Sequence, residues 1–384
     1  MAMKIALPDE TGRMTDYVLT GTPLPHTVLP ANPARIVYSA AHVVADPFSA
    51  ADPSGQAAVD WEKTLEFRRY LAGLGLGIAE AMDTAQRGMG MDWPRSLELI
   101  RRTRAELPDA LIGNGCGTDH LDPADVTSVD QVIGAYMEQV EAIQAVGGRL
   151  ILMASRALVQ VAKSGRDYER VYRTVLAGCD QKVILHWLGE MFDPALEGYW
   201  GSRDFDVALE TVLAIIEENR SRIDGIKISL LDKEKEIILR RRLPEGVRMY
   251  TGDDFNYPEL IAGDTQGFSH ALLGIFDPLA AAASYAVAKL GEGDVAAFHA
   301  ALDPTVPLAR LIFRAPTRFY KTGVVFLAWL NGFQDHFIMV NGAQAMRPLP
   351  YFTGIFRLAD GCGLLRDPEL AASRMKSLLA LYGA

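Results

Sequence analysis

The chain has 384 residues, 49% of them hydrophobic, and a formal net charge of −10 at pH 7. The length exceeds one ordinary domain, and the apolar content predicts a globular protein with a sizeable core. The acidic balance argues against nucleic acid or an anionic membrane surface as a main partner.

Cysteine usage and the first residues predict a cytoplasmic protein. The three cysteines, Cys116, Cys179 and Cys362, are far apart and odd in number, which fits a reducing compartment. Residues 1–10 lack the basic start and apolar run of a secretory signal. The longest apolar runs, near 279–288 and 323–330, are too short to span a bilayer.

Taken in chain order, the sequence begins with an irregular, proline-containing segment, residues 1–35, in which a short hairpin around 4–7 and 16–19 is expected. From Arg35 onward, apolar strand patterns alternate with amphipathic helical patterns. The expected strands are 36–41, 77–83, 110–115, 149–154, 182–187, 225–230, 248–252 and 267–272. The expected helices are 57–74, 93–106, 129–146, 167–176, 205–223, 232–241, 257–261 and 279–290, followed by 294–302, 307–313, 316–331 and 368–382.

Strands that alternate with helices predict a parallel sheet, and eight such units predict closure into a (β/α)8 TIM barrel. We therefore expect an irregular N-terminal segment over 1–35, a barrel over 36–290 and a helical C-terminal region over 291–384. The alternative is an open doubly wound sheet, which usually has a glycine-rich phosphate turn after its first strand. Here the first strand is followed by HVVADP, which contains no glycine.

The sixth expected strand carries a lysine in its middle. Because side chains alternate along a strand, Ile226 and Ile228 point to one face while Gly225, Lys227 and Ser229 point to the other. A weakly solvated lysine loses its preference for the charged form, and a neutral amine can form a Schiff base with a carbonyl. The structural alternative is a lysine that extends to water and does no chemistry.

Polar residues gather where the expected strands end, and in a barrel these ends form the active-site face. Each could instead be a cap or a loop residue. They are Ser39, His42, Asp83, Asn114, Asp119, His120, Ser155, Arg156, His186, Glu190, Lys227, Ser229, Asp253, Asp254 and His270.

These residues give the chain a resemblance to the dihydrodipicolinate synthase / N-acetylneuraminate lyase superfamily of class I, Schiff-base aldolases. It resembles a divergent, little-characterised branch that was once grouped as a domain of unknown function. The resemblance runs from about Arg35 to the C-terminus. It rests on Gly225-Ile226-Lys227 with Ser229, on Thr251-Gly252-Asp253-Asp254, and on Gly113-Asn114-Gly115.

The resemblance implies that Lys227 is the imine-forming nucleophile. The family has a proton-shuttling tyrosine at the end of the fifth strand, and His186 stands in that place here. The family's Gly-Thr-Thr-Gly-Glu loop, which binds the substrate carboxylate, is replaced by EAMDTAQ over residues 80–86. The residues expected to bind substrate are Asp83, Asn114, Asp119, His120, Arg156, Ser229 and Asp253.

The predicted function is therefore a lyase or aldolase that joins Lys227 to an oxo-acid or sugar-derived carbonyl, without cofactor or metal, in a homo-oligomer. One alternative is a metal-dependent barrel enzyme, for which Asp83, Glu80, His120, His186, Glu190, Asp253 and His270 supply donors, although no HxH or HExxH pair is present. Another is a binding protein that kept the fold and lost the chemistry.

Overall fold

A computed structural model of the chain describes residues 3–9, 11–53, 55 and 57–384. The chain divides into two compact units. One comprises residues 35–41 and 77–274, and the other comprises residues 1–34, 42–76 and 275–384. These units are groups of residues in mutual contact, whereas the expected boundaries at residues 35 and 290 divide the chain by the order of its strands and helices. The three-part division therefore stays a prediction.

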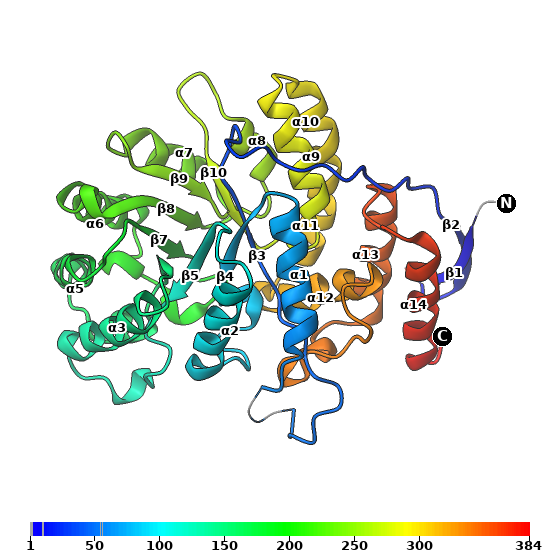
Figure 1. The fold of residues 1–384 in the computed structure, drawn as a ribbon, viewed down its shortest axis with the longest axis horizontal. Helices are drawn as coiled ribbons and strands as arrows, with labels where there is room; N and C mark the ends of the chain where they lie inside the picture. The colour runs from blue at the N-terminus through cyan, green and yellow to red at the C-terminus, as the bar shows by residue number, and fades with distance from the viewer. Residues whose placement is uncertain (1–2, 10, 54, 56) are drawn as a thin grey trace. The chain divides into compact units, whose positions relative to one another are not determined.

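Within the described residues, the first unit contains a closed barrel of eight parallel strands (Figure 1). The strands are β3 (Val37–Ala40), β4 (Gly77–Glu80), β5 (Ile112–Cys116), β6 (Arg149–Leu152), β7 (Val183–Leu188), β8 (Ile223–Ser229), β9 (Arg248–Thr251) and β10 (His270–Leu273). They pair in sequential order, and β10 closes onto β3. The predicted TIM barrel is confirmed, and the open sheet was the wrong alternative.

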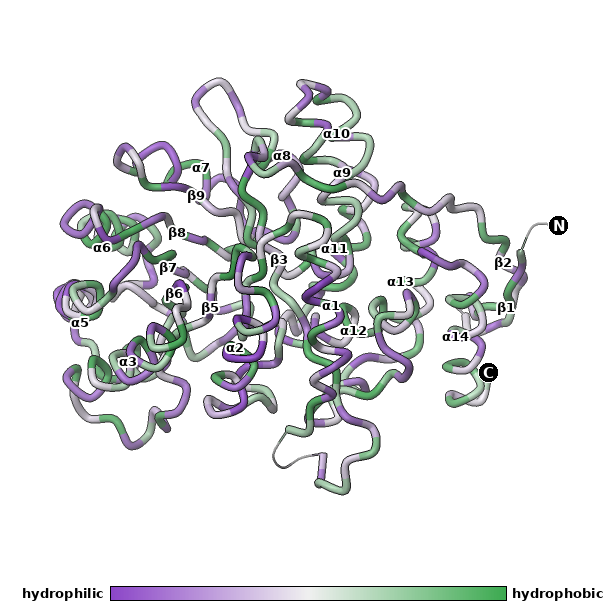
Figure 2. Tube along the Cα trace, in the orientation of Figure 1, coloured by the Kyte–Doolittle hydropathy of each residue, from purple (hydrophilic) through white to green (hydrophobic). Residues whose placement is uncertain are grey.

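The helices of this unit form because their apolar residues recur every three or four positions and, except in α8, a side chain caps the first turn. They are α2 (Trp93–Glu106), α3 (Val129–Gln144), α4 (Arg156–Val161), α5 (Gly165–Ala177), α6 (Phe205–Glu218), α7 (Lys233–Arg242) and α8 (Tyr257–Ala262). In α3, Ser128 and Gln131 form a capping box. Figure 2 shows hydrophilic and hydrophobic colours alternating along α3, α5 and α6, as amphipathic helices require.

Large side chains fill the barrel interior. Tyr38, Ile151, Ile184, Tyr250 and Leu272 come from five different strands and form one buried cluster. Layers of this kind make the centre of a TIM barrel a packed core rather than a pore. Functional side chains are therefore expected above this cluster, at the carboxyl ends of the strands.

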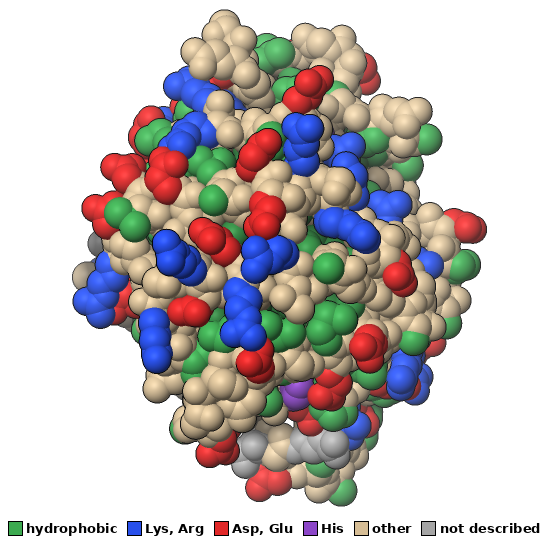
Figure 3. Space-filling model, turned by 90° about the vertical axis from the view of Figure 1, so that its left-hand side faces the viewer, with side chains coloured by type: hydrophobic (Ala, Val, Ile, Leu, Met, Phe, Trp, Pro, Cys, Tyr) green, Lys and Arg blue, Asp and Glu red, His purple; other side chains and the backbone are tan. Residues whose placement is uncertain are grey.

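The outer face of this unit carries charges of both signs. In Figure 3, Lys and Arg side chains are interspersed with Asp and Glu. Neighbouring helices of this unit are also joined by ion pairs, among them Arg170 with Asp130 and Arg242 with Glu210. This face is therefore not a single basic patch.

The second unit is mostly helical. The expected hairpin is present as β1 (Lys4–Pro8) and β2 (Met14–Val18), which pair antiparallel. Its helices are α1 (Trp61–Gly73), α9 (Ala280–Gly291), α10 (Val295–Leu302), α11 (Val306–Ile312), α12 (Tyr320–Leu330), α13 (Leu349–Gly361) and α14 (Pro368–Leu381). The sequence did not predict α13, and α12 begins at Tyr320 rather than at 316 because a 3₁₀ turn, Thr317–Phe319, precedes it. Among the described residues, no helix has the length and apolar character needed to cross a bilayer.

Candidate functional site

Lys227 lies inside the barrel. On β8, it is in register with His186 of β7 and with Tyr250 of β9, and Tyr250 belongs to the interior cluster. Residues in register on parallel strands point to the same face, so all three side chains lie on the inner side. Lys227 is only 7% exposed. The predicted alternation along this strand is confirmed.

The surroundings of Lys227 disfavour its protonated form. Burial lowers the pKa of the amine below 10.5, and the negative charges of Asp254 and Asp83 partly oppose this effect. Among the described residues, no carboxylate lies within the 4.0 Å of an ion pair with the Lys227 amine. A structural salt bridge, the arrangement that would hold the amine charged, is therefore not what the structure contains.

A glycine makes room for the lysine. A Cβ atom built on Gly252 would lie 2.7 Å from Lys227 Cε and 2.7 Å from the carbonyl oxygen of Ile228. It would also collide with the hydroxyl of Ser229. Any larger residue here must displace the lysine side chain, so the glycine of the Gly-Asp-Asp segment has a steric role in the site.

His186 is buried beside the lysine and is held neutral. Burial lowers the pKa of its imidazole well below 6.5, and the positive charge of Lys227 adds to this effect. Its Nε2 lies 3.2 Å from Ser229 Oγ, while Nδ1 has no hydrogen-bond partner among the described residues. A neutral imidazole with one unpartnered nitrogen can accept or pass on a proton.

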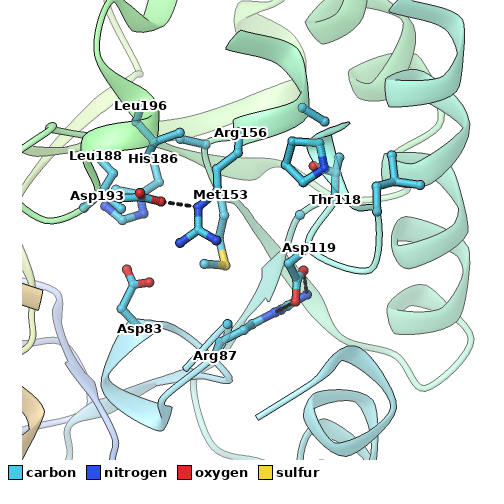
Figure 4. A pocket seen from close by; sticks show the side chains of 16 residues that line it. Asp83, Arg87, Thr118, Asp119, Met153, Arg156, His186, Leu188, Asp193 and Leu196 are labelled. Atoms are coloured by element: carbon cyan, nitrogen blue, oxygen red, sulfur yellow. Dashed lines mark hydrogen bonds and ion pairs between the residues drawn. The ribbon is translucent and has the colours of Figure 1, made fainter. Parts of the chain in front are cut away.

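A cavity opens beside these residues at the carboxyl ends of the strands (Figure 4). Its charged and polar lining residues are Asp83, Arg87, Thr118, Asp119, Arg156, His186 and Asp193. Lys227 does not itself line the cavity. It lies beside it, on the strand next to that of His186.

Among the carboxylates that line the cavity, Asp83 is the one whose negative charge raises the pKa of Lys227. It begins the short 3₁₀ turn Asp83–Ala85 directly after β4, and Figure 4 shows its carboxyl group pointing into the cavity. Arg156 faces it from the start of α4, and Arg156 Nε donates to Asp193 Oδ2. The two groups thus border the same space from opposite sides.

Arg87 is one of the polar lining residues that the sequence analysis missed, together with Thr118 and Asp193. Its guanidinium forms a two-pronged pair with Asp119, with Nε to Oδ2 at 3.0 Å and Nη2 to Oδ1 at 2.7 Å. It also donates to Gln139 Oε1 and to the carbonyl oxygens of Ala81 and Gly115. Burial works against ionisation of Asp119, but Arg87 outweighs it and lowers the pKa of that carboxyl group. The only sequence signal was its place in the loop after the second barrel strand.

Comparison with known families gives one match, to a family described as a protein of unknown function, DUF993, over residues 5–384. The chain belongs to the DUF993 family. No curated protein matches it.

Solved structures similar to this DUF993 chain share its fold at low sequence identity. The dihydrodipicolinate synthase of Acinetobacter baumannii, solved in complex with pyruvate, is 14% identical, with a TM-score of 0.63 over 87% of this chain and 100% of that one. The 4-hydroxy-tetrahydrodipicolinate synthase of Methylacidiphilum fumariolicum SolV is 15% identical, with a TM-score of 0.63 over 90% and 99%. The enzyme of Aquifex aeolicus is 12% identical, with a TM-score of 0.60 over 91% and 98%. The expected resemblance is confirmed at the level of the fold.

The structure of the DUF993 chain brings some of the predicted site residues together. Asp83, Asp119, Arg156 and His186 line the cavity, and Lys227 lies beside it with Ser229 bonded to His186. Their roles in binding or catalysis stay predictions.

The other three predicted residues make contacts of a different kind. Asn114 donates to the carbonyl oxygen of Arg149, because Gly113 and Gly115 take the inner positions of β5 and Asn114 takes the outer face. His120 contacts Gln139 and Glu138 rather than the cavity. Asp253 accepts hydrogen bonds from the backbone and side chain of Asn256, which organises the loop after β9.

Among the residues that the structure describes, no three His, Cys, Asp or Glu side chains are grouped so that they could hold a metal ion. The donors counted from the sequence are thus dispersed. The metal-dependent alternative gains no specific observation in its favour.

Proposed function

We propose that this chain is a class I lyase or aldolase that forms a Schiff base between Lys227 and an oxo-acid or sugar-derived carbonyl substrate. The observation that carries the proposal is a buried strand lysine without an ion-pair partner among the described residues, beside a neutral histidine and a polar cavity. Lysines activated in this way are recognised nucleophiles toward carbonyl groups. The shared fold with dihydrodipicolinate synthases agrees with this chemistry.

The proposed reaction follows from the lysine's lone pair. Lys227 Nζ attacks the carbonyl carbon, and the resulting carbinolamine loses water to give an iminium ion. For cleavage, a base removes the proton of the hydroxyl group on the β-carbon, and that carbon leaves as the carbonyl of an aldehyde or ketone. The electron pair of the broken Cα–Cβ bond moves toward the iminium, which becomes an enamine. Protonation of the enamine carbon and hydrolysis by water then release the product and regenerate the amine.

His186 is suited to move protons in these steps. Its pKa lies well below 6.5, so it is neutral at pH 7 and available as a base. It is in register with Lys227 on a neighbouring strand, and such strands lie about 4.8 Å apart. The Nε2 contact with Ser229 fixes the orientation of the ring.

Trapping with borohydride tests the proposal. Carbonyl compounds, both oxo acids and small sugars, are incubated with the protein, the iminium is reduced, and the modified residue is identified by mass spectrometry. We expect an adduct on Lys227 that is abolished in Lys227→Ala. Lys233→Ala is the matched control, because Lys233 is a nearby exposed lysine paired with Glu259 and should not affect trapping.

Three results would contradict the proposal. An adduct that survives Lys227→Ala would place the nucleophile elsewhere. Equal loss of the adduct in Lys233→Ala would mean that trapping does not depend specifically on Lys227. A folded protein that traps no carbonyl compound would favour the non-catalytic alternative.

A further inference from the structure

We infer that the carbonyl compound accepted at Lys227 is a hydroxylated aldehyde or ketone, in which a hydroxyl-bearing carbon rather than a carboxylate is attached to the carbonyl carbon. This inference rests on the proposed Schiff base and specifies its substrate class. It rests on the residues that directly follow β4, above all Asp83, and on the two arginines that line the cavity.

The first two residues after β4, Ala81 and Met82, offer neither a positive charge nor a hydroxyl group to a carboxylate, and Thr84 of the same turn does not line the cavity. Ala81 and Met82 are buried, and Met82 packs into the apolar cluster of the barrel interior. Asp83 follows, with its carboxyl group directed into the cavity. An oxo acid that formed an imine with Lys227 would place its own carboxylate in the field of this negative group.

Each arginine of the cavity forms an ion pair with an aspartate, Arg87 through two nitrogens and Arg156 through Nε alone. Arg87 uses Nε and Nη2 on Asp119 and Nη1 on the backbone, and only 4% of it is exposed. Arg156 is paired with Asp193 on the side of the cavity across from Asp83. The lining therefore holds three carboxylates against two arginines, so negative charge already exceeds that of the arginines before an anionic substrate enters.

A hydroxyl group in that position has the opposite preference. It can donate a hydrogen bond to Asp83, whose side chain accepts none from the other described residues. The same carboxylate also stabilises the positive iminium that forms on Lys227, which a bound anion would otherwise have to do. Asp83 thus supplies the negative charge that a substrate carboxylate would otherwise place beside the iminium.

Hydroxyacetone and pyruvate provide a direct test, because they differ only in a hydroxymethyl group or a carboxylate beside the same methyl ketone. The two compounds compete for trapping on Lys227, and the ratio of the reduced adducts is measured by mass spectrometry. We expect the hydroxyacetone adduct to dominate by about tenfold or more, as close like charges in a partly buried site require.

The variant Asp83→Asn keeps the shape of the side chain and removes its charge. We expect it to shift the adduct ratio toward pyruvate by roughly tenfold, while a thermal melt confirms that it is folded. Asp125→Asn is the matched control, because Asp125 is exposed in a turn whose Pro123 lines the cavity. It should leave the ratio unchanged.

The outcomes separate the two proposals. A Lys227 adduct formed mainly from pyruvate would overturn the substrate class and leave the Schiff base standing. An unchanged ratio in Asp83→Asn, or an equal shift in Asp125→Asn, would also overturn the inference. Trapping of neither compound, nor of any other carbonyl compound, would overturn the Schiff base and with it this inference.

Discussion

The reactivity of Lys227 depends on how burial and two nearby carboxylates balance. Burial lowers its pKa and is the larger effect, while Asp254 and Asp83 raise it. The amine is therefore less basic than that of a surface lysine, although the two carboxylates still stabilise its protonated form. This balance has a consequence that can be measured as a function of pH.

We expect the initial rate of adduct trapping on Lys227 to rise with pH and to reach half its plateau below pH 10.5. The sign follows from the chemistry: only the neutral amine attacks, and a lowered pKa makes it available at lower pH. Asp83→Asn removes a charge that favours the protonated form, so the midpoint should move lower still. A midpoint at or above 10.5 in the wild type would show that the amine is held charged.

At the scale of single strands, the sequence predicted much of the site because a strand repeats every two residues. On β8, the alternation placed Lys227 and Ser229 on the inner side correctly. On β5 it could not decide, because all five residues of Ile112–Cys116 are buried and most are small. Asn114 was therefore assigned to the cavity although it lies on the outer face.

Loops were less predictable than strands. Asp253 was expected to bind substrate, yet its carboxylate is used to order its own loop. Arg87 was overlooked because its pairing with Asp119 depends on two loops that follow different strands. Neither arrangement has a periodic pattern in the sequence, since loop geometry depends on specific hydrogen bonds.

The segment after β9 provides a prediction about packing. Gly252→Ala should reduce trapping at Lys227, because the added methyl group would lie 2.7 Å from Lys227 Cε. Overpacking of this kind costs about 1–3 kcal/mol in the free energy of unfolding. Gly134→Ala in α3 is the control, since nothing lies within 4 Å of its added methyl group. Equal trapping in both variants would show that Gly252 is not needed to seat the lysine.

For the whole molecule, a buried carboxyl group on α7 links stability to pH. Burial raises the pKa of Glu236 to about 8, although hydrogen bonds from Ser269 and Thr251 oppose this. The folded state therefore binds a proton that the unfolded state releases above its ordinary pKa of 4.5. Stability contributed by this proton is complete below pH 4.5 and is lost as the pH rises toward 8.

We expect Glu236→Gln to flatten the decline in the free energy of unfolding between pH 5 and 8, by an amount on the order of 3 kcal/mol. Glutamine keeps the hydrogen-bonding shape without an ionisable group. Urea unfolding at several pH values measures the effect. The exposed Glu234→Gln on the same helix is the control, and an identical pH profile in Glu236→Gln and the wild type would contradict the expectation.

The register of His186, Lys227 and Tyr250 has a consequence for how this family can diversify. These positions are fixed by the backbone hydrogen bonds between the neighbouring strands β7, β8 and β9, so their spacing does not depend on any loop. Asp83, Arg87 and Arg156 belong to segments that follow the strands. In the function proposed above, the bond-forming residues and the residues that select the substrate thus belong to different parts of the chain. Under that proposal, substitutions within residues 81–87 and 153–157 are expected to change the preferred substrate without moving Lys227 or His186.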